Sequence, residues 1–386
     1  MRLKKVWSPV GIRALRRKML AQRIAIVGGS LGGLAMANAL ARAGAEVVVF
    51  ERGQAGFETR GGGLGLDLRS AQALLGTLPP HLVLRERSLW AGSFEVREPT
   101  ALPVTAYGAM WRWLRDGLPQ NAELRFGVHI EAGALESNGI RLVGADTPMP
   151  VFDLLVAADG GTSTLRNTLN QPAAERVYAG YVLWRGIVPA DALAEESGLR
   201  ERFHIATDPH HHFVAYPIPS PDGALSPGAR SINWGWYFPL READMRTLYD
   251  AELTDAPHAI GRLHLPPLWS ELLAREALHR WPRWAQELVE TSTCLGLLAP
   301  HPIFVYRPNG LVAARFVCTG DAAHLASPIT GAGARMASED ALELTNALTT
   351  EATLTAALIR YEKARLPQVR AIVEQGLELG ARFAAV

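Results

Sequence analysis

Three small residues and one acid near the start of the chain have the types and spacing that bind a phosphate and a sugar. Gly28, Ser30 and Gly33 take the three positions of a G-x-G-x-x-G pattern, with serine in the middle, and Glu51 follows the pattern. Glycines at such a turn let the backbone approach a pyrophosphate, and the free N–H groups of a helix start bind it. The acid accepts a hydrogen bond from an unphosphorylated ribose. The pattern therefore predicts a dinucleotide site for FAD or NAD.

The neighbouring residues predict the elements that such a site needs. Residues 23–27 form a short apolar run, residues 34–44 are rich in Ala and Leu and end at Gly44, and residues 46–50 form a second apolar run. A helix-forming segment closed by glycine, between two apolar runs, indicates a strand–helix–strand unit. The two strands of such a unit are expected to be parallel.

A second constellation of this kind starts at Cys318. An apolar run ends in Gly320 and Asp321, and a loop with Pro328 and two glycines leads into a helix expected over residues 334–348. A carboxylate at a strand end suits a ribose or ribityl hydroxyl, and the dipole of the helix start stabilises negative charge on a reduced isoalloxazine ring. From these residues alone, an ordinary strand–loop–helix crossover stays open as the alternative.

The composition argues against several classes of protein. The 386 residues carry a formal net charge of +1, so we expect neither nucleic acid nor an anionic membrane as a partner. No apolar run is long enough to predict a membrane span. Cys294 and Cys318 lack a metal-ligand spacing, and the three histidines at 210–212 are interpreted as a solvated turn, so no metal site is expected. We expect a cytoplasmic protein, with a homodimer left open.

The later motifs resemble one known family. The string that begins at Gly320, GDAAHLASPITGAG, resembles the flavin motif of the class A, single-component FAD-dependent monooxygenases, which have the p-hydroxybenzoate hydroxylase fold. The string AADGGTSTLR, with Asp159 and Arg166, resembles the DG motif of the same family. YVLWRG and INWGWYFP are similar to its dihydroxypyridine-hydroxylase-like branch. The resemblance runs in the family's order from Gln22 to Leu366.

The resemblance implies the residues that bind FAD. The first glycine-rich turn would hold the pyrophosphate, Glu51 the ribose, and the backbone of Val128 the adenine. Asp159 and Arg166 would also dock NADH or NADPH as a transient reductant, because the family has no second glycine-rich fold for it. The full set implied for the cofactor is Gly28, Gly29, Ser30, Leu31, Gly32, Gly33, Glu51, Arg52, Arg112, Val128, Asp159, Asp321, Pro328, Gly331, Ala332 and Gly333.

The resemblance also implies the hydroxylation of an electron-rich aromatic or heteroaromatic small molecule. NAD(P)H would reduce the flavin, O2 would add to give a C4a-hydroperoxide, and its distal oxygen would attack the ring. His204 and Tyr216 are the candidate bases for a substrate hydroxyl. An ordinary core position is the alternative for each member of the expected substrate pocket, which comprises Trp184, Arg185, Phe213, Trp234 and Trp236.

The fold class that follows is α/β. We expect a discontinuous Rossmann-like FAD-binding domain, an inserted mainly-β substrate domain whose strands carry the aromatic residues, and C-terminal helices. The basic first residues are expected to form a loosely held extension. The boundaries are residues 1–20 for the extension, 21–100, 106–175 and 291–350 for the FAD-binding domain, 176–290 for the substrate domain and 351–386 for the C-terminal helices.

Three other functions stay open. The main alternative is a flavin-dependent reductase or dehydrogenase of the same fold. WGWYFP also resembles an element of flavin-dependent tryptophan halogenases, but these need an active-site lysine, and the chain has none between Lys18 and Lys363. A flavin-binding protein without catalysis would hold FAD and show no reduction stimulated by a substrate.

Overall fold

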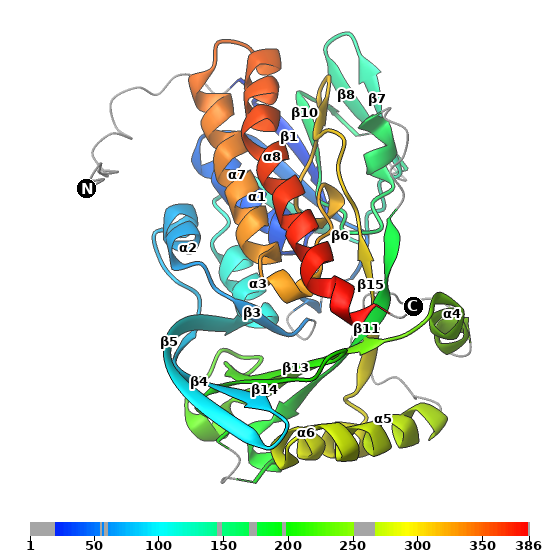
Figure 1. Ribbon diagram of the computed structural model, residues 1–386. Coiled ribbons are helices and arrows are strands. Elements are labelled where there is room, and N and C mark those ends of the chain that lie inside the picture. The colour runs from blue at the N-terminus through cyan, green and yellow to red at the C-terminus, as the bar shows by residue number, and fades with distance from the viewer. Residues whose placement is uncertain are drawn as a thin grey trace, which may run out of the picture.

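Two β-sheets, each backed by helices, make up most of the molecule (Figure 1). One sheet lies within the upper part of this view, and the larger, curled sheet crosses the lower part. The computed structural model describes residues 20–54, 56–57, 61–144, 149–169, 176–194, 198–250 and 267–384. Most of the expected N-terminal extension lies outside the described residues.

The upper sheet is mainly parallel and has six strands in the order β16-β17-β10-β1-β2-β6. β1 lies near its centre and pairs in parallel with β2 and β10. The inner strands are almost wholly apolar, as strands covered on both faces must be. The bounds are β1 Arg23–Val27, β2 Glu46–Glu51, β6 Ala122–Phe126, β10 Leu154–Ala157, β16 Val312–Ala313 and β17 Phe316–Cys318.

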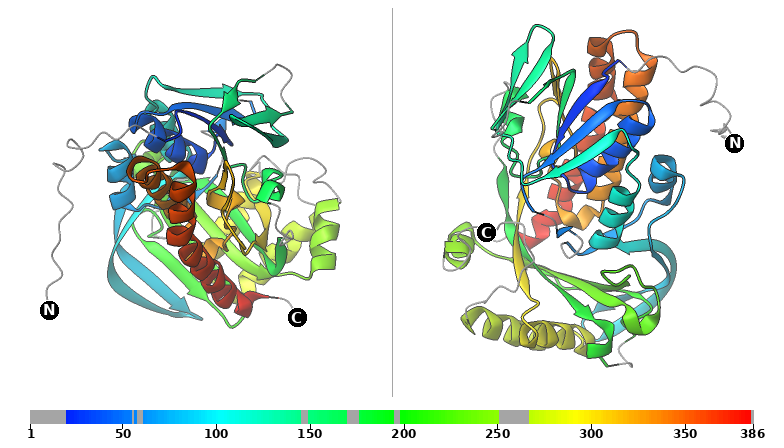
Figure 2. Two further views of the ribbon diagram at one scale, coloured as in Figure 1. Left: turned by 90° about the horizontal axis from the view of Figure 1, so that it is seen from above. Right: turned by 180° about the vertical axis from the view of Figure 1, so that it is seen from behind.

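Helices cover one face of this sheet, and a small three-stranded sheet lies on the other side (Figure 2). The helices are α1 Leu31–Arg42, α2 Leu68–Leu75, α3 Tyr107–Asp116, α7 Gly333–Thr350 and α8 Leu354–Gly380. The small sheet consists of β7 Ala132–Glu136, β8 Gly139–Val143 and β9 Val151–Phe152. Within the described part of the chain, no helix has the length and apolar character needed to cross a membrane.

The lower sheet has eight strands in the order β15-β11-β14-β13-β12-β4-β5-β3, and only β12 and β4 pair in parallel. Its bounds are β3 Gly63–Gly65, β4 Leu82–Ala91, β5 Phe94–Ala106, β11 Val177–Pro189, β12 Phe203–Thr207, β13 His212–Ile218, β14 Ser231–Pro239 and β15 Ala299–Val305. α5 Pro267–Arg280 and α6 Arg283–Cys294 pack under the sheet, and α4 Glu242–Asp250 lies at its edge (Figure 1).

The two faces of the lower sheet pack against different partners, because successive side chains of a strand point to opposite faces. Trp184 of β11 and Trp234 and Trp236 of β14 pack in one apolar cluster with α5 and α6. Tyr181 of β11 lies on the other face, where its hydroxyl donates to Ser327 Oγ at 2.8 Å in the loop before α7. The sheet therefore forms a wall between a helix-side core and the space below the upper domain.

The expected domain boundaries need a correction at three places. β3, β4 and β5, and also β15, belong to the eight-stranded sheet, although their residues were assigned to the FAD-binding domain or, for residues 101–105, to no domain. The long hairpin of β4 and β5 carries charged side chains and few aromatic ones, so its composition differs from the aromatic-rich strands of residues 176–290. Its pairing with β12 depends on residues more than a hundred positions away, which local sequence patterns do not reveal.

Candidate active site

The first glycine turn has the backbone geometry that only glycine tolerates. Gly28 has φ of 112°, and a Cβ there would collide with the carbonyl of Ala158 at the end of β10. A Cβ on Gly33 would collide with the carbonyl of Gly28 itself. Any larger residue at either position would push α1 away from the ends of β1 and β10. The turn therefore brings the start of α1 directly onto the edge of the upper sheet.

The start of α1 has no side-chain cap among the described residues. Ser30 occupies the N-cap position, but its hydroxyl lies 2.7 Å from the hydroxyl of Tyr107 on α3 and not on the helix N–H groups. The first N–H groups of a helix need partners, and the dipole there favours negative charge. An anion such as a pyrophosphate fits these donors.

Glu51 is fixed at the end of β2, beside this helix start. Its Oε2 accepts from the N–H of Gly29 at 2.8 Å, and its Oε1 accepts from the N–H of Gly53 at 2.7 Å. The N–H of Val128 donates to the backbone carbonyl of Glu51 at 3.0 Å. Each carboxylate oxygen keeps a second lone pair for a hydroxyl group. The predicted ribose acid and the predicted adenine neighbour thus lie together, and Arg52 follows them as an exposed side chain.

We expect Glu51→Ala to weaken FAD retention by about 1–3 kcal/mol, because the N–H groups of Gly29 and Gly53 and the ribose hydroxyl each lose an acceptor. Glu46→Ala is the matched control, since Glu46 is exposed at the other end of the same strand. FAD affinity is measured by flavin fluorescence on titration of the stripped protein. An unchanged affinity in Glu51→Ala would reject the ribose assignment.

A second helix start without a side-chain cap lies beside the first. Ala332 is the N-cap of α7 and makes no side-chain cap, and Gly331 before it has φ of 61° after the turn at Pro328. A Cβ on Gly32 of α1 would lie 3.6 Å from Cβ of Ala337 on α7, so the first turns of the two helices are in contact. A Cβ on Gly333 would meet no atom within 4 Å. The positive ends of the α1 and α7 helix dipoles therefore face the same open region.

Arg166 joins the two loops that carry the predicted aspartates. Its Nε donates to the carbonyl of Ala322 at 2.7 Å, next to Asp321, and one Nη donates to the carbonyl of Gly161 at 3.2 Å. Its guanidinium also lies 3.9 Å from the ring centre of Tyr306. Burial lowers the pKa of this guanidinium. Arg166 was predicted to dock NAD(P)H. In the structure it joins the loop after β10, which carries Asp159 and is called the DG loop here, to the loop between β17 and α7, which carries Asp321 and is called the flavin loop here.

The two predicted aspartates have different surroundings. Asp159 accepts from the hydroxyl of Ser163 at 2.6 Å and from the N–H of Thr164 at 3.1 Å, so it shapes its own loop. Asp321 is open to solvent, yet protein surrounds its carboxyl, and this burial raises its pKa. A carboxyl that is surrounded by protein and still reachable from solvent can bind a ligand hydroxyl.

A buried network beneath the flavin loop was missed by the sequence analysis. Asp340 of α7 accepts from His324 Nε2 at 2.7 Å, from the N–H of Gly320 at 3.0 Å and from Arg365 Nε of α8 at 2.7 Å. Burial acts to raise the pKa of Asp340, but His324 and Arg365 outweigh it and hold the pKa below its usual value. Asp340 therefore fixes the backbone of the loop that carries Asp321.

The glycine-rich segment before α2 lies on the open face of the lower sheet. The N–H of Gly63 donates to Asn233 Oδ1 at 2.8 Å. A Cβ on Gly62 would collide with the guanidinium of Arg185, and one on Gly63 would lie 2.7 Å from the hydroxyl of Tyr216. Arg185, Tyr216 and Asn233 therefore form a polar group beneath the upper domain, which we call the polar floor.

Burial sets the charge states of the polar floor. It raises the pKa of Tyr216 to about 12, and it lowers the pKa of Arg185. Phe203 of β12 stacks on Tyr216, with ring centroids 4.8 Å apart and planes at 11°. At neutral pH Tyr216 keeps its proton and Arg185, as an arginine, keeps its charge. The floor thus offers one hydroxyl donor and one cation.

The expected substrate pocket needs a correction. Only Arg185 and Tyr216 lie on the open face of the sheet. The other candidates lie on the helix side, because they alternate with the open-face residues along their strands. These candidates are fully or almost fully buried, either within the apolar cluster that includes α5 and α6 or packed against a tryptophan of that cluster. They are Trp184, His204, Phe213, Trp234 and Trp236.

His204 illustrates the reason for this correction. Its Nε2 lies 3.2 Å from the carbonyl of Gly198, and its ring lies 4.9 Å from that of Trp284 on α6. Burial lowers its pKa to about 4. A neutral imidazole on the far side of the sheet cannot take a proton from a substrate on the open face.

Two further predictions meet the structure as follows. Arg112 was expected near the cofactor, and its guanidinium donates to the carbonyl of Pro221, so it links α3 to the turn after β13. In the histidine run, His211 is buried and its Nδ1 accepts from Trp236 Nε1 at 3.1 Å, which differs from the expected solvated turn. Among the described residues, no group of three His, Cys, Asp or Glu side chains is placed to hold a metal.

Comparisons with known proteins agree with this arrangement. Three family models match parts of the chain: an NAD(P)-binding Rossmann-like domain over residues 26–60, an FAD binding domain-like family over 178–291 and an FAD binding domain over 309–376. The chain is 29% identical to the 3-amino-4-hydroxybenzoate 2-monooxygenase of Streptomyces platensis, over 94% of this chain and 88% of the relative. It is 27% identical to the 2,6-dihydroxypyridine 3-monooxygenase of Paenarthrobacter nicotinovorans, over 94% and 91%.

Solved structures show the same fold. The 2,6-dihydroxypyridine-3-hydroxylase from Arthrobacter nicotinovorans superposes with a TM-score of 0.79 at 24% identity, covering 95% of this chain and 94% of that one. HpxO of Klebsiella pneumoniae, solved with FAD and uric acid, superposes with a TM-score of 0.74 at 20% identity, covering 93% and 88%. Both sheets are therefore part of a shared fold.

Proposed function

We infer that this chain, which is an FAD-dependent monooxygenase related to aromatic hydroxylases, acts on a small, electron-rich aromatic or heteroaromatic compound that carries an ionisable hydroxyl group. The observation that carries this inference is the polar floor, since Arg185 and Tyr216 lie on the one sheet face that the flavin loops approach. A cation there favours the ionised form of a phenol or pyridinol, and ionisation makes the ring richer in electrons.

The cofactor fits the residues that are present. Two adjacent helix starts without side-chain caps, and the fixed carboxylate of Glu51, match the pyrophosphate and the ribose of FAD. FAD supplies, when bound, electron transfer from NAD(P)H and the activation of O2. The helix dipole of α7 favours negative charge at its start, where Gly331 and Gly333 leave the backbone open. Asp321 is placed to bind a cofactor hydroxyl.

Within this proposal, Arg185 and Tyr216 orient the substrate and neither acts as a general base. Tyr216, with its pKa near 12, donates its hydroxyl proton to a substrate oxygen across the neutral range. Arg185 holds the ionised oxygen by charge. His204 plays no part, because the sheet separates it from the substrate.

We expect Tyr216→Phe to lower kcat/KM by up to about tenfold, the cost of one neutral hydrogen bond. The pH profile of kcat/KM between about pH 6 and about pH 10 should keep its shape, because Tyr216 does not titrate there. Loss of an ionisation from this profile in the variant would show that Tyr216 is a base after all.

The function is tested by oxygen-dependent oxidation of NADH and NADPH in the presence of phenols, hydroxypyridines and aminohydroxybenzoates. A hydroxylase incorporates one atom of labelled O2 into the product, in proportion to the NAD(P)H consumed. A reductase or dehydrogenase of the same fold would consume NAD(P)H with its substrate under anaerobic conditions and add no oxygen. That outcome would replace the hydroxylase proposal.

A cytoplasmic location and a homodimer complete the proposal. Cys294 is exposed and Cys318 is buried, and both are free thiols, which suits a reducing compartment. The homodimer is proposed without a contact in the structure that would require it. Light scattering of the FAD-loaded protein measures its mass, and the mass of a single chain would reject it.

A further inference from the structure

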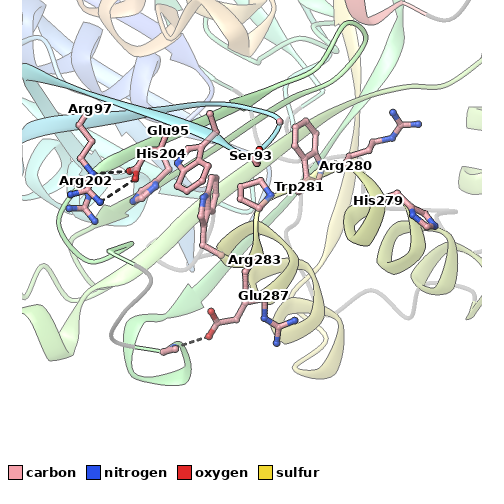
Figure 3. Close-up of a pocket in the computed structure, with 15 residues that line it drawn as sticks. Ser93, Glu95, Arg97, Arg202, His204, His279, Arg280, Trp281, Arg283 and Glu287 are labelled. Carbon is pink, nitrogen blue, oxygen red and sulfur yellow. Dashed lines mark hydrogen bonds and ion pairs between the residues drawn. The ribbon is translucent and has the colours of Figure 1, made fainter.

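A second pocket lies on the helix side of the lower sheet. It has a volume of about 980 Å³, is open to solvent on one side, and is lined by the β4–β5 hairpin, the first part of β12 and the junction of α5 with α6 (Figure 3). The lower sheet separates it from the polar floor. A volume of this size holds an ordinary small-molecule ligand.

Three tryptophans form one wall of this pocket. They are Trp90 of β4, Trp281 between α5 and α6, and Trp284 of α6, and the rings of Trp90 and Trp284 lie 6.5 Å apart. The indole N–H of each is buried, with no hydrogen-bond partner among the described residues, so the carbon surface of the rings is what borders the pocket. Such a surface suits a planar ring.

Cations gather at one end of the pocket. In Figure 3, Arg97 and Arg202 lie together at the end that also holds Glu95 and His204. Arg97 is paired with Glu95 through two hydrogen bonds, at 2.9 and 3.2 Å. Among the described residues Arg202 is poorly paired, because its Nε is buried without a partner and its ion pair with Glu86 measures 3.3 Å. An arginine in this state gains a good partner from a carboxylate.

The arginines of the lining are paired with acids, and one acceptor has no partner among the described residues. The four arginines pair with Glu95, Glu86, Asp208 and Glu290, and the glutamate Glu287 accepts from the N–H of Ala194 at 2.7 Å. The imidazole of His204 faces the carbonyl of Gly198 through Nε2, which leaves Nδ1 buried without a partner. A hydroxyl or amino group on the ligand would donate to that nitrogen.

We propose that this pocket is a second small-molecule site, which binds a planar aromatic carboxylate with its ring against Trp90, Trp281 and Trp284 and its carboxylate on Arg202. The aromatic wall supplies stacking area, and the arginine supplies a bidentate donor. The site is independent of the flavin, since the sheet lies between them.

The strand that carries the site also reaches the polar floor. Arg202 and His204 line the pocket, and Phe203 between them points to the opposite face and stacks on Tyr216. A ligand that contacts Arg202 and His204 therefore lies one strand residue away from the ring that stacks on Tyr216, and it contacts no part of the flavin-binding loops.

The test uses the FAD-loaded protein and benzoate or 4-hydroxybenzoate as probes. Titration is followed at once by tryptophan fluorescence, by calorimetry and by the visible flavin spectrum, because a ligand at the second site quenches tryptophan and leaves the flavin bands unchanged. We expect such a phase in the wild type. Arg202→Met should weaken it by about tenfold or more, since the methionine keeps the apolar stem and loses the charge.

Two further variants make the result decisive. Arg275→Met changes an exposed arginine of α5 that does not line the pocket, and it should bind as the wild type does. Ser93→Trp places a large ring from the exposed hairpin turn into the pocket, and it should abolish the flavin-silent phase even if Arg202→Met fails to fold. The proposal is overturned if the wild type shows no flavin-silent binding at millimolar probe, or if Arg202→Met or Ser93→Trp binds as tightly as Arg275→Met.

Discussion

Replacing Asp340 by asparagine is expected to destabilise the protein by about 3–5 kcal/mol, the usual cost of removing one partner from a buried ion pair. Asp340 is fully buried, and asparagine keeps only one of its two acceptor oxygens, so either Arg365 Nε, or His324 together with the N–H of Gly320, loses its acceptor. Arg365 keeps its ion pair with Glu339 at 2.9 Å, but the buried negative charge between Arg365 and His324 is gone. The flavin loop then loosens and FAD dissociates faster. Urea unfolding of the flavin-free protein, together with flavin release rates, measures both effects.

Two control variants distinguish this mechanism from a general loss of charge. Asp116→Asn removes an exposed carboxylate that pairs with Arg115 at 2.7 Å, and it should change stability by less than about 1 kcal/mol. The double variant Asp340→Asn with Arg365→Met removes both buried charges, keeps an acceptor oxygen for Gly320 and His324, and should be less damaged than Asp340→Asn. If the double variant is the less stable of the two, the buried charge on Arg365 is not the cause of the loss.

The pH dependence of this effect follows from the lowered pKa of Asp340. A carboxyl whose pKa is lower in the folded state stabilises the fold fully above its unfolded pKa, which is about 3.9. That contribution disappears as the pH falls through the lower, folded value. The stability gap between the wild type and Asp340→Asn should therefore be constant near neutral pH and shrink below about pH 4.

Replacing Arg185 by methionine is expected to reduce kcat/KM by about 10²–10³-fold, the range seen when a single charged or hydrogen-bonding stabiliser is removed from an active site. The substrate oxygen then lacks a cation, so less of the substrate is bound in its ionised form. The loss should be greatest for substrates with a high hydroxyl pKa. Steady-state NAD(P)H oxidation with a series of substituted phenols or pyridinols measures this trend.

Trp184→Phe is the matched control, because Trp184 precedes Arg185 on the same strand and points to the opposite face. It should cost some stability through lost packing and leave kcat/KM close to the wild-type value. Arg185→Lys keeps the charge and should recover part of the activity. Equal kinetic damage in Trp184→Phe and Arg185→Met would remove Arg185 from the substrate site.

The geometry of the glycine turns and of the strand that ends at Glu51 could be predicted because its causes are local. The turn from Gly28 to Gly33 requires glycine for reasons of backbone geometry, and those reasons act within a few residues. The same is true of Gly331, which has a positive φ just before α7. Glu51 ends a strand whose length and apolar character are visible in the sequence. Such features survive any change in distant parts of the fold.

Which side chains of a strand point toward the substrate side could not be predicted, because both faces of the lower sheet are buried. Trp234 and Trp236 share a face, as the alternation of side chains along a strand requires, but alternation does not tell which face borders the substrate site. Polar residues between the aromatic ones, such as Arg185 and Asn233, were the available indication. Burying an arginine or an asparagine in a strand costs free energy unless that face of the strand offers polar partners, so these residues mark the polar face.

The network around Asp340 lay beyond the reach of the sequence for another reason. Its partner Arg365 is on a different helix, and nothing in either helix's periodicity shows that an acid and an arginine meet in the core. The β4–β5 hairpin is a similar case, since its place in the lower sheet depends on a parallel pairing with β12. Contacts between distant segments decide these features.

The alternation of side chains along β11 and β14 gives protein engineers a simple rule of parity. On both strands the odd-numbered side chains face the upper domain, where Tyr181, Leu183 and Tyr237 pack with Phe383, and Arg185 and Asn233 belong to the polar floor. The even-numbered side chains build the hydrophobic layer over α5 and α6. Mutant libraries that aim at new substrates should therefore randomise positions 185 and 233 and keep their even neighbours. Libraries that aim at heat tolerance should do the reverse.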